Sequence, residues 1–153
     1  AQGPGGGPPP WPPGGPLAAA TDTAAPRRDS LVALLRASIA GKEQMPAESV
    51  FKNIQKMKGQ TAGRLVGIMA GGYSRSLGVS CEHCHDVKAY DSDDKAAKNV
   101  ARGMMDMTAM INTQVLPSIK GIQSQRAFVN CGTCHRGFPR PGVNPGGNNR
   151  PAP

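Results

Sequence analysis

The chain has 153 residues and a formal net charge of +8 at pH 7, and only 4% of its residues are aromatic. The basic residues are scattered, and no basic run is interleaved with aromatic side chains, which disfavours a nucleic-acid-binding surface and indicates a solvated basic face. No stretch approaches the about 20 apolar residues of a membrane span, and the length suits a single domain.

Both ends of the chain are rich in proline and glycine. All but two of the 15 prolines and half of the 20 glycines lie in residues 1–26 and 137–153. Proline lacks a backbone donor and glycine is conformationally free, so such segments favour extended or flexible coil. The sequence therefore predicts an N-terminal arm (1–26), a folded domain (27–136) and a C-terminal tail (137–153).

Two helical segments are predicted directly after the arm. The first has apolar residues at helical spacing, namely Leu31, Leu34, Leu35 and Ile39. Asp29 or Ser30 would cap its amino end, and Gly41 would end it. The second is a short turn or helix whose apolar residues recur at intervals of three, namely Phe51, Ile54 and Met57. Gly59 would end this second segment.

A longer helix is predicted from about Ala62 to Leu77. Thr61 would begin it, and Gly78 would close it, because glycine readily adopts the left-handed conformation that ends many helices. One side of this helix carries mainly apolar side chains, from Leu65, Ile68, Met69, Gly72 and Tyr73. The helix therefore ends just before the first cysteine of the chain.

The pentapeptide Cys-x-x-Cys-His occurs twice, at 81–85 and 131–135, and it uses all four cysteines. This spacing lets two thiols bond to the two vinyl groups at one porphyrin edge, while the next residue places its imidazole under the iron. The sequence therefore predicts two covalently bound haem c groups. Their attachment residues are Cys81, Cys84, His85, Cys131, Cys134 and His135.

A zinc ribbon, a redox dithiol and a structural disulfide are the alternative uses of paired cysteines. None of them explains why a histidine follows both pairs. A zinc ribbon also spaces its two pairs about 15 to 20 residues apart, whereas a much longer segment separates Cys84 from Cys131. Haem attachment is therefore the favoured interpretation.

A polar loop with an acidic cluster, residues 91–94, leads into the most regular apolar pattern of the chain. Negative charge favours the positive amino end of a helix, so we expect a helix to begin there and to end before Pro117. Its apolar stripe consists of Ala97, Val100, Met104, Met107, Ile111 and Val115. Because no alternating apolar run indicates a strand, we predict an all-α fold of two units, each a helix followed by Cys-x-x-Cys-His.

Each motif histidine, His85 or His135, is the predicted proximal ligand of its haem iron. His83 is the one other histidine of the chain, and it lies inside the first motif, where it cannot reach over its own iron. We therefore expect His83 to face solvent. A methionine thioether is then the favoured sixth ligand.

Seven methionines are present, and their positions narrow the choice of ligand. Met69 lies on the apolar side of the helix before the first motif. Met104 and Met107 both lie on the stripe of the helix before the second motif, so periodicity alone does not separate them. Met105 and Met110 are rotated away from that stripe by about 100° or more.

Several runs of residues resemble the photosynthetic reaction-centre cytochrome c subunit family and its non-phototrophic relatives. These runs are SLGVSC at 76–81, VARGMMDMT at 100–108 with Ile111 and Asn112, CGTCHRG at 131–137 and FKNIQ at 51–55. The resemblance covers about residues 46–141. It implies that a methionine on the helix before each motif is the sixth ligand, at Met69 and Met104. The family's subunit holds four haems, so the chain resembles one half of it.

Iron with both axial positions filled by protein changes oxidation state with little movement and offers no vacancy to a substrate. We therefore predict single-electron transfer and no enzymatic catalysis. The ligand pairs would be His85 with Met69 and His135 with Met104. The expected partners are redox proteins with acidic surfaces, which the basic face would guide into contact.

Two other functions remain open. The proline-rich arm, with Trp11 as an anchor, would suit packing on neighbouring copies, which would make the chain a repeating subunit of an extracellular cytochrome filament. A haem peroxidase or a gas sensor would instead need one iron with an open or labile sixth position. This last alternative becomes the first choice if neither iron keeps a methionine ligand.

The expected location is outside the cytoplasm. The first residues, Ala-Gln-Gly-Pro, show neither the basic start nor the apolar stretch of a signal peptide, which predicts that such a peptide has already been removed. Bacteria attach haem to Cys-x-x-Cys-His on the outer side of the cytoplasmic membrane. The sequence therefore predicts an exported protein, either periplasmic or extracellular.

Overall fold

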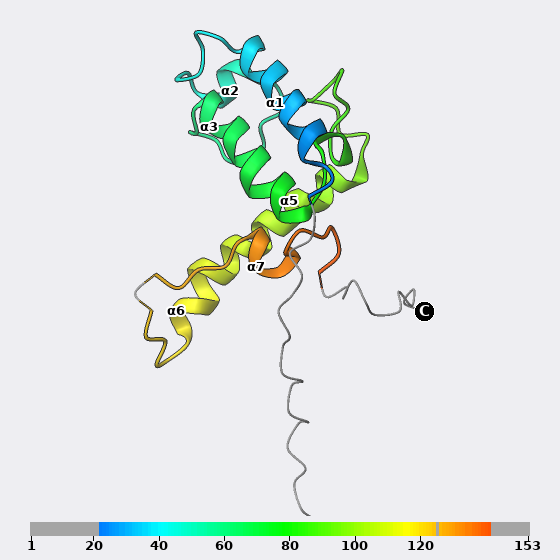
Figure 1. Cartoon of the computed structure of the whole chain (residues 1–153). Coiled ribbons are helices and arrows are strands. Elements are labelled where there is room, and N and C mark those ends of the chain that lie inside the picture. Colours follow the sequence, from blue (N-terminus) through cyan, green and yellow to red (C-terminus); the bar gives the residue numbers. More distant parts are fainter. Residues whose placement is uncertain (1–21, 125, 142–153) are drawn as a thin grey trace, which may run out of the picture.

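The computed structural model describes residues 22–124 and 126–141, which form helices joined by loops (Figure 1). No strand is present among these residues; two isolated bridges join Pro46 to Thr61 and Asp86 to Ala89. The prediction of an all-α fold is therefore confirmed. None of the helices in the described ranges is long and apolar enough to cross a membrane.

The predicted arm and tail fall largely on residues 1–21 and 142–153, which lie outside the described residues. Trp11 is among them. The division into arm, domain and tail stays a prediction, and so does the interpretation of the two ends as contacts within a filament.

Helix α1 spans Ala25–Ser38 and begins earlier than the sequence predicts. Its first turn contains Pro26, which suits this position because the first amides of a helix have no partner within the helix. Asp29 and Ser30 lie inside the helix, so the prediction that one of them caps it is wrong. Gly41 follows the end of the helix with a φ of 78°, which agrees with its predicted role as a stop.

Helix α2 spans Ala47–Val50, and the residues after it are not helical. Asn53, Met57 and Gly59 have positive φ angles of 58°, 61° and 81°, which a right-handed helix does not accommodate. The predicted helical turn at residues 51–57 is therefore wrong. Its apolar side chains recur because they face inward: Phe51 packs against the core, and Ile54 and Met57 line a cavity.

Residues 62–77 are helical throughout, as the sequence predicts. They comprise α3 (Ala62–Gly67), a π-helical segment (Ile68–Ser74) and α4 (Arg75–Leu77). The Thr61 side chain caps the amino end by accepting a hydrogen bond from the Arg64 amide, and Gly78 closes the helix with a φ of 65°. The π-helical segment has a wider hydrogen-bonding pattern that apolar periodicity does not reveal.

The helix after the acidic loop runs as α5 (Ala96–Met110), a π-helical segment (Ile111–Val115) and α6 (Leu116–Ser118). Its cap position is Lys95, so no residue of the acidic cluster caps it. The helix also continues through Pro117, although the sequence predicts an end before it. Pro117 stands in the first turn of α6, and the wide turn just before it accommodates a residue that has no amide donor.

The hydrophobic core is small and lies where α1 packs against α3. It consists of Ile39, Ala62 and Val66, with Val32, Leu35, Val50 and Phe51 packed against them. This cluster contains no residue of α5. Figure 1 shows α1, α2 and α3 grouped at one end of the long helix and α6 at the other.

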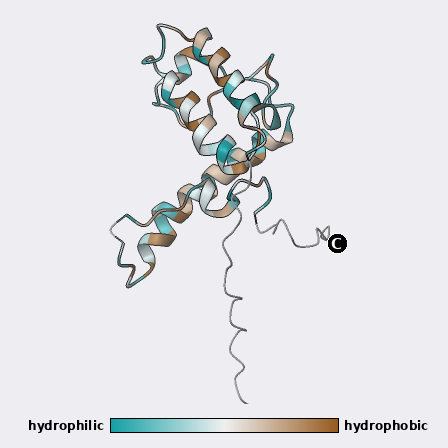
Figure 2. Cartoon of the chain, in the orientation of Figure 1, coloured by the Kyte–Doolittle hydropathy of each residue, from teal (hydrophilic) through white to brown (hydrophobic). Residues whose placement is uncertain are grey.

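The apolar stripe of α5 is largely exposed. Val100 is 57% exposed, Met104 41% and Met107 45%. Figure 2 shows hydrophobic residues along this helix as well as among α1, α2 and α3. The sequence pattern therefore identifies the apolar face of α5 correctly, but in the polypeptide alone this face does not join the core.

Candidate haem sites

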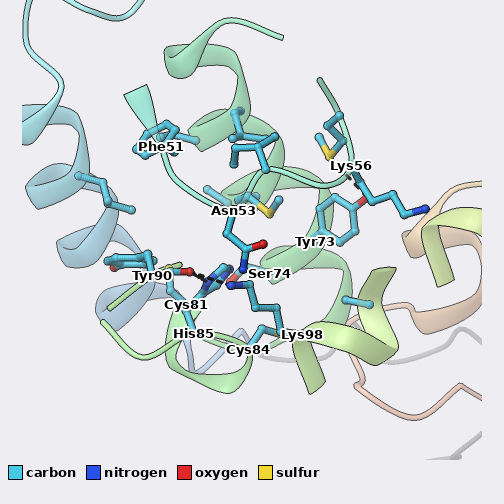
Figure 3. Close-up of a pocket in the computed structure, with 18 of the residues that line it drawn as sticks. Phe51, Asn53, Lys56, Tyr73, Ser74, Cys81, Cys84, His85, Tyr90 and Lys98 are labelled. Carbon is cyan, nitrogen blue, oxygen red and sulfur yellow. Dashed lines mark hydrogen bonds between the residues drawn. The ribbon is translucent and has the colours of Figure 1, made fainter. Parts of the chain in front are cut away.

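The first Cys-x-x-Cys-His motif lines a cavity of about 320 Å³. The motif contributes Cys81, Cys84 and His85, and Met69 from the π-helical segment lines the same cavity. Figure 3 shows the three motif side chains together with Tyr73, Tyr90 and other lining residues. A volume of this size falls in the usual range of small-molecule sites. The fold thus gathers the predicted attachment residues and the predicted sixth ligand of the first haem around one space.

The His85 ring is oriented by a hydrogen bond to the backbone. Its Nδ1 lies 3.0 Å from the carbonyl oxygen of Tyr90. A carbonyl accepts only, so this contact places the proton on Nδ1 and leaves the Nε2 lone pair available to a metal. Burial lowers the pKa of His85, and the nearby cations Lys98 and Arg102 act in the same direction. Both effects favour the neutral imidazole that a metal ion requires.

A charged network borders this cavity. Lys98 is only 9% exposed, and its Nζ lies 3.0 Å from the Tyr90 carbonyl and 3.0 Å from the Asp93 carboxylate. Arg102 contacts the same carboxylate at 2.9 Å. Hydrogen bonds from Arg102, Asn53 and Lys98 hold the pKa of Asp93 well below its usual range. Asp93 therefore stays ionised and offsets part of the positive charge at this edge.

The residues around the cavity fit a haem group. A porphyrin is a flat apolar ring with two carboxylates at one edge. The cavity walls are mostly apolar, and four basic side chains also line it, from Lys52, Lys56, Lys98 and Arg102. Basic side chains beside a buried space satisfy carboxylates that would otherwise be desolvated without a partner.

The second motif forms helix α7 (Cys131–His135). Asn130 caps it through a capping box, in which Asn130 and Thr133 each accept a hydrogen bond from the other's amide. The Nδ1 atom of His135 lies 2.9 Å from the Phe138 carbonyl oxygen. This arrangement repeats that of His85 with Tyr90, so the second histidine also keeps Nε2 free for a ligand bond.

The methionines of α5 divide between its two faces. Met105 lines the cavity of the first motif, together with Ala101 and Arg102, whereas Met104 and Met107 lie on the exposed stripe. The apolar periodicity of α5 correctly separates Met105 from Met104, but it does not predict that Met105 faces the first cavity. A second face of α5 is visible in the sequence at helical spacing, and it would have pointed to this contact. It consists of residues 98, 101, 102 and 105.

Zinc binding, dithiol redox chemistry and disulfide formation by the cysteines find no support in the described part of the chain. All four thiols are free, and no cluster of three or more His, Cys, Asp or Glu side chains there is able to hold a metal ion. A redox dithiol needs a lowered thiol pKa, yet burial raises the pKa of both Cys81 and Cys84. His83 is exposed, as predicted.

The chain is similar to known cytochromes. The family model described as "Photosynthetic reaction centre cytochrome C subunit" matches residues 18–144. Cytochrome c-554 of Chloroflexus aurantiacus is 29% identical over 87 residues, which are 57% of this chain and 20% of that protein. The photosynthetic reaction center cytochrome c subunit of Rubrivivax gelatinosus is 39% identical over 61 residues, which are 40% of this chain and 15% of that protein. The matched region therefore spans a fifth or less of these curated relatives.

Proposed function

The chain belongs to the photosynthetic reaction centre cytochrome c subunit family, and from that premise we propose that it transfers electrons through two covalently bound c-type haems. Membership of this family implies haem c and electron transfer; the number of haems is our inference from the two motifs. The observation that carries the proposal is the cavity shared by Cys81, Cys84, His85 and Met69. Haem supplies an iron centre that accepts and releases one electron.

At the first site, Cys81 and Cys84 would form the two thioether bonds, and His85 would bind the iron through Nε2. Met69 is the proposed sixth ligand, supported by its place in the same cavity wall. Lys98 and Arg102 would offset the charge of the haem carboxylates. A thioether as the second axial ligand raises the reduction potential relative to a second imidazole and fills the last coordination position.

At the second site, Cys131 and Cys134 are the proposed thioether donors, and His135 is the proposed proximal ligand. Met104 is the proposed sixth ligand, because it matches the family position. Its side chain is 41% exposed in the polypeptide alone, so it is not enclosed by the core. A haem at this site would also cover apolar side chains that the polypeptide leaves in water.

We infer that the protein is an electron carrier and not an enzyme, because both irons would have two protein ligands. Haem attachment to Cys-x-x-Cys-His supports a location outside the cytoplasm, in the periplasm or beyond the cell. Its partners would be redox proteins, and the net charge of +8 favours partners with acidic surfaces.

Mass spectrometry of the natively matured protein tests the proposal most directly. The expected result is the polypeptide mass plus two haems. Carbon monoxide should bind the reduced protein slowly and incompletely, because a methionine would fill the sixth position of each iron. The bare polypeptide mass would refute the proposal, and rapid stoichiometric binding of the gas would refute methionine ligation.

A further inference from the structure

We propose that the contact between Gly78 and Gly137 joins the two haem-attachment segments and thereby sets the distance between the haems. Gly78 ends the helix that precedes the first motif, and Gly137 follows the second motif by two residues. The inference rests on the proposed function, because it requires both haems to be present. Gly78 and Gly137 are positioning residues in this role, since neither is a proposed ligand.

The two backbones approach too closely for any side chain at Gly78. A Cβ atom there would lie 2.0 Å from the carbonyl oxygen of Gly137 and 2.9 Å from its carbonyl carbon, and real Cβ atoms essentially never come within 3.0 Å of another heavy atom. Both residues also have left-handed backbones, with φ angles of 65° and 89°. Glycine is therefore required at position 78 for two independent reasons.

A hydrogen bond holds the same segments together, and a second close approach accompanies it. The Gly137 amide donates a hydrogen bond of 2.8 Å to the Ser76 carbonyl. A Cβ atom on Gly132, inside the second motif, would lie 3.3 Å from the Ser76 hydroxyl oxygen. Helices α4 and α7 thus pack closely, although the first motif, α5, α6 and the loops between them separate the two helices in sequence.

The proposed haem-attachment residues lie only two or three residues from the contact between Gly78 and Gly137. Cys81 follows Gly78 by three residues and His135 precedes Gly137 by two, so the chain can span at most about 11 Å and about 7 Å between them. The first link is braced by the Val79 amide, which donates to the Ser74 carbonyl at 3.0 Å. The second is braced by the Phe138 amide, which donates to the His135 carbonyl at 2.9 Å. A displacement at the glycine contact is therefore passed to both attachment sites.

The distance between the haems has measurable consequences. The charge change on one iron affects the other with an energy that falls as the reciprocal of their separation. Two haems also couple optically and magnetically, and both couplings weaken as the separation grows. These readouts distinguish a positioning role from a purely structural one, because a loss of stability alone does not change them.

The test compares Gly78→Ala with Gly41→Ala in the holoprotein. Both substitutions place alanine at a positive φ, 65° and 78°, but Gly41 has no atom within 4 Å of the new Cβ. We expect Gly78→Ala to lose amplitude in the paired Soret circular dichroism bands and to shift the haem–haem distance measured by pulsed electron paramagnetic resonance. Gly41→Ala should give the same Soret bands and the same haem–haem distance as the unmodified protein. Identical distances in all three proteins would overturn the proposal.

Gly132→Ala is the milder variant and decides the matter if Gly78→Ala does not mature. Its Cβ would meet the hydroxyl of Ser76 and the side-chain oxygen of Asn130 at 3.3 Å each. We expect a smaller shift in the haem–haem distance, which Ser76→Ala in the same protein partly reverses because it removes the hydroxyl. No shift in Gly132→Ala would overturn the proposal. If the unmodified protein carries fewer than two haems, the proposed function fails instead, so the two failures are distinguishable.

Discussion

The two Cys-x-x-Cys-His motifs share their local geometry but differ in their surroundings. Each histidine donates a hydrogen bond from Nδ1 to a backbone carbonyl oxygen, at 3.0 Å for His85 and 2.9 Å for His135. The first motif faces a cavity whose other walls come from α1, the segment after α2, the helix of residues 62–77 and α5. The second motif lies on α7, where Cys134 is exposed, and the apolar stripe of α5 is open to solvent.

This difference shows which part of a haem site the motif itself provides. The pentapeptide supplies the proposed attachment residues and the proposed proximal histidine, and a carbonyl just beyond it, from Tyr90 or Phe138, orients the histidine ring. Enclosure comes from elsewhere in the chain, and only the helix before the first motif packs on the hydrophobic core. We therefore expect the first haem to be part of the folding unit and the second to be more accessible and less important for stability.

The largest expected effect is the removal of the first haem. Cys81→Ala with Cys84→Ala would prevent its attachment and leave the cavity of about 320 Å³ without its occupant. At about 24 cal/mol per Å³ of cavity, the loss in unfolding free energy reaches an upper bound of about 8 kcal/mol, comparable with the whole stability of a small domain. We expect no cooperative thermal transition by circular dichroism.

The matched control is Cys131→Ala with Cys134→Ala. It should retain one haem by mass spectrometry and show a much smaller fall in melting temperature, because Cys134 and the apolar stripe of α5 are exposed in the described part of the chain. Equal losses of stability in the two double variants would contradict the difference in enclosure.

The next largest effect concerns the sixth ligands. Met69→Ala should open the first iron to carbon monoxide and lower its reduction potential, and Met104→Ala should do the same at the second iron. The gas should reach the second iron faster, because that site is open. Absorption spectra after flash photolysis, combined with redox titration, separate the two haems.

Met105→Ala is the control for this pair of variants. Met105 lines the first cavity without being a proposed ligand, so its removal should loosen packing there but leave both irons closed to the gas. If Met107→Ala, and not Met104→Ala, opened the second iron, the ligand assignment there would have to move by one turn of the helix.

A smaller effect is expected from the charged network at the first site. Asp93→Asn removes the carboxylate that contacts Lys98 and Arg102 at 3.0 and 2.9 Å. Their positive charge would then be less compensated, which favours the reduced iron, so the potential of the first haem should rise while the second stays unchanged. Asp94→Asn is the control, because Asp94 contacts the Ser92 hydroxyl at 2.6 Å. A rise at both haems would mean that the two sites are not electrostatically distinct.

The smallest expected effect is a pH dependence. The pKa of Asp93 is lowered from its usual 3.8, chiefly by its hydrogen bond with Arg102. A carboxylate whose pKa is lower in the folded protein stabilises the fold fully when the pH is above its pKa in the unfolded chain. This contribution is lost as the pH falls through its pKa in the folded protein. The melting temperature of the unmodified protein should therefore exceed that of Asp93→Asn at pH 6 and approach it below about pH 4. A gap that stays constant down to the acid limit would contradict this.

The sequence predicts those features that depend on local chemistry. The helix of residues 62–77 is predicted with both of its ends, because Thr61 has a side chain suited to capping and Gly78 tolerates a positive φ. The all-α fold follows from the spacing of apolar residues. The proposed haem-binding role of the two motifs rests on the chemistry of thioether attachment.

Sequence periodicity does not predict features that depend on tertiary contacts. The apolar residues after α2 recur as in a helix, yet Asn53 and Met57 have left-handed backbones and line a cavity formed by distant elements. Periodicity places Met105 away from the apolar stripe of α5, but what Met105 faces depends on the distant elements that form the cavity. The approach of Gly78 to Gly137 leaves no periodic signal, since both residues also look like ordinary helix ends.

The wide turn at Ile68–Ser74 has one more consequence. A π-helical turn carries a surplus residue, which the helix accommodates without changing the alignment of the parts on either side. Deleting Gly71 should therefore convert this stretch to ordinary α geometry and preserve the alignment of α3 with the first cysteine. Deleting a residue from α3 instead would rotate everything before it by about 100° relative to the haem. We therefore expect the helix to tolerate shortening at the π-helical segment beside Met69 but not in α3.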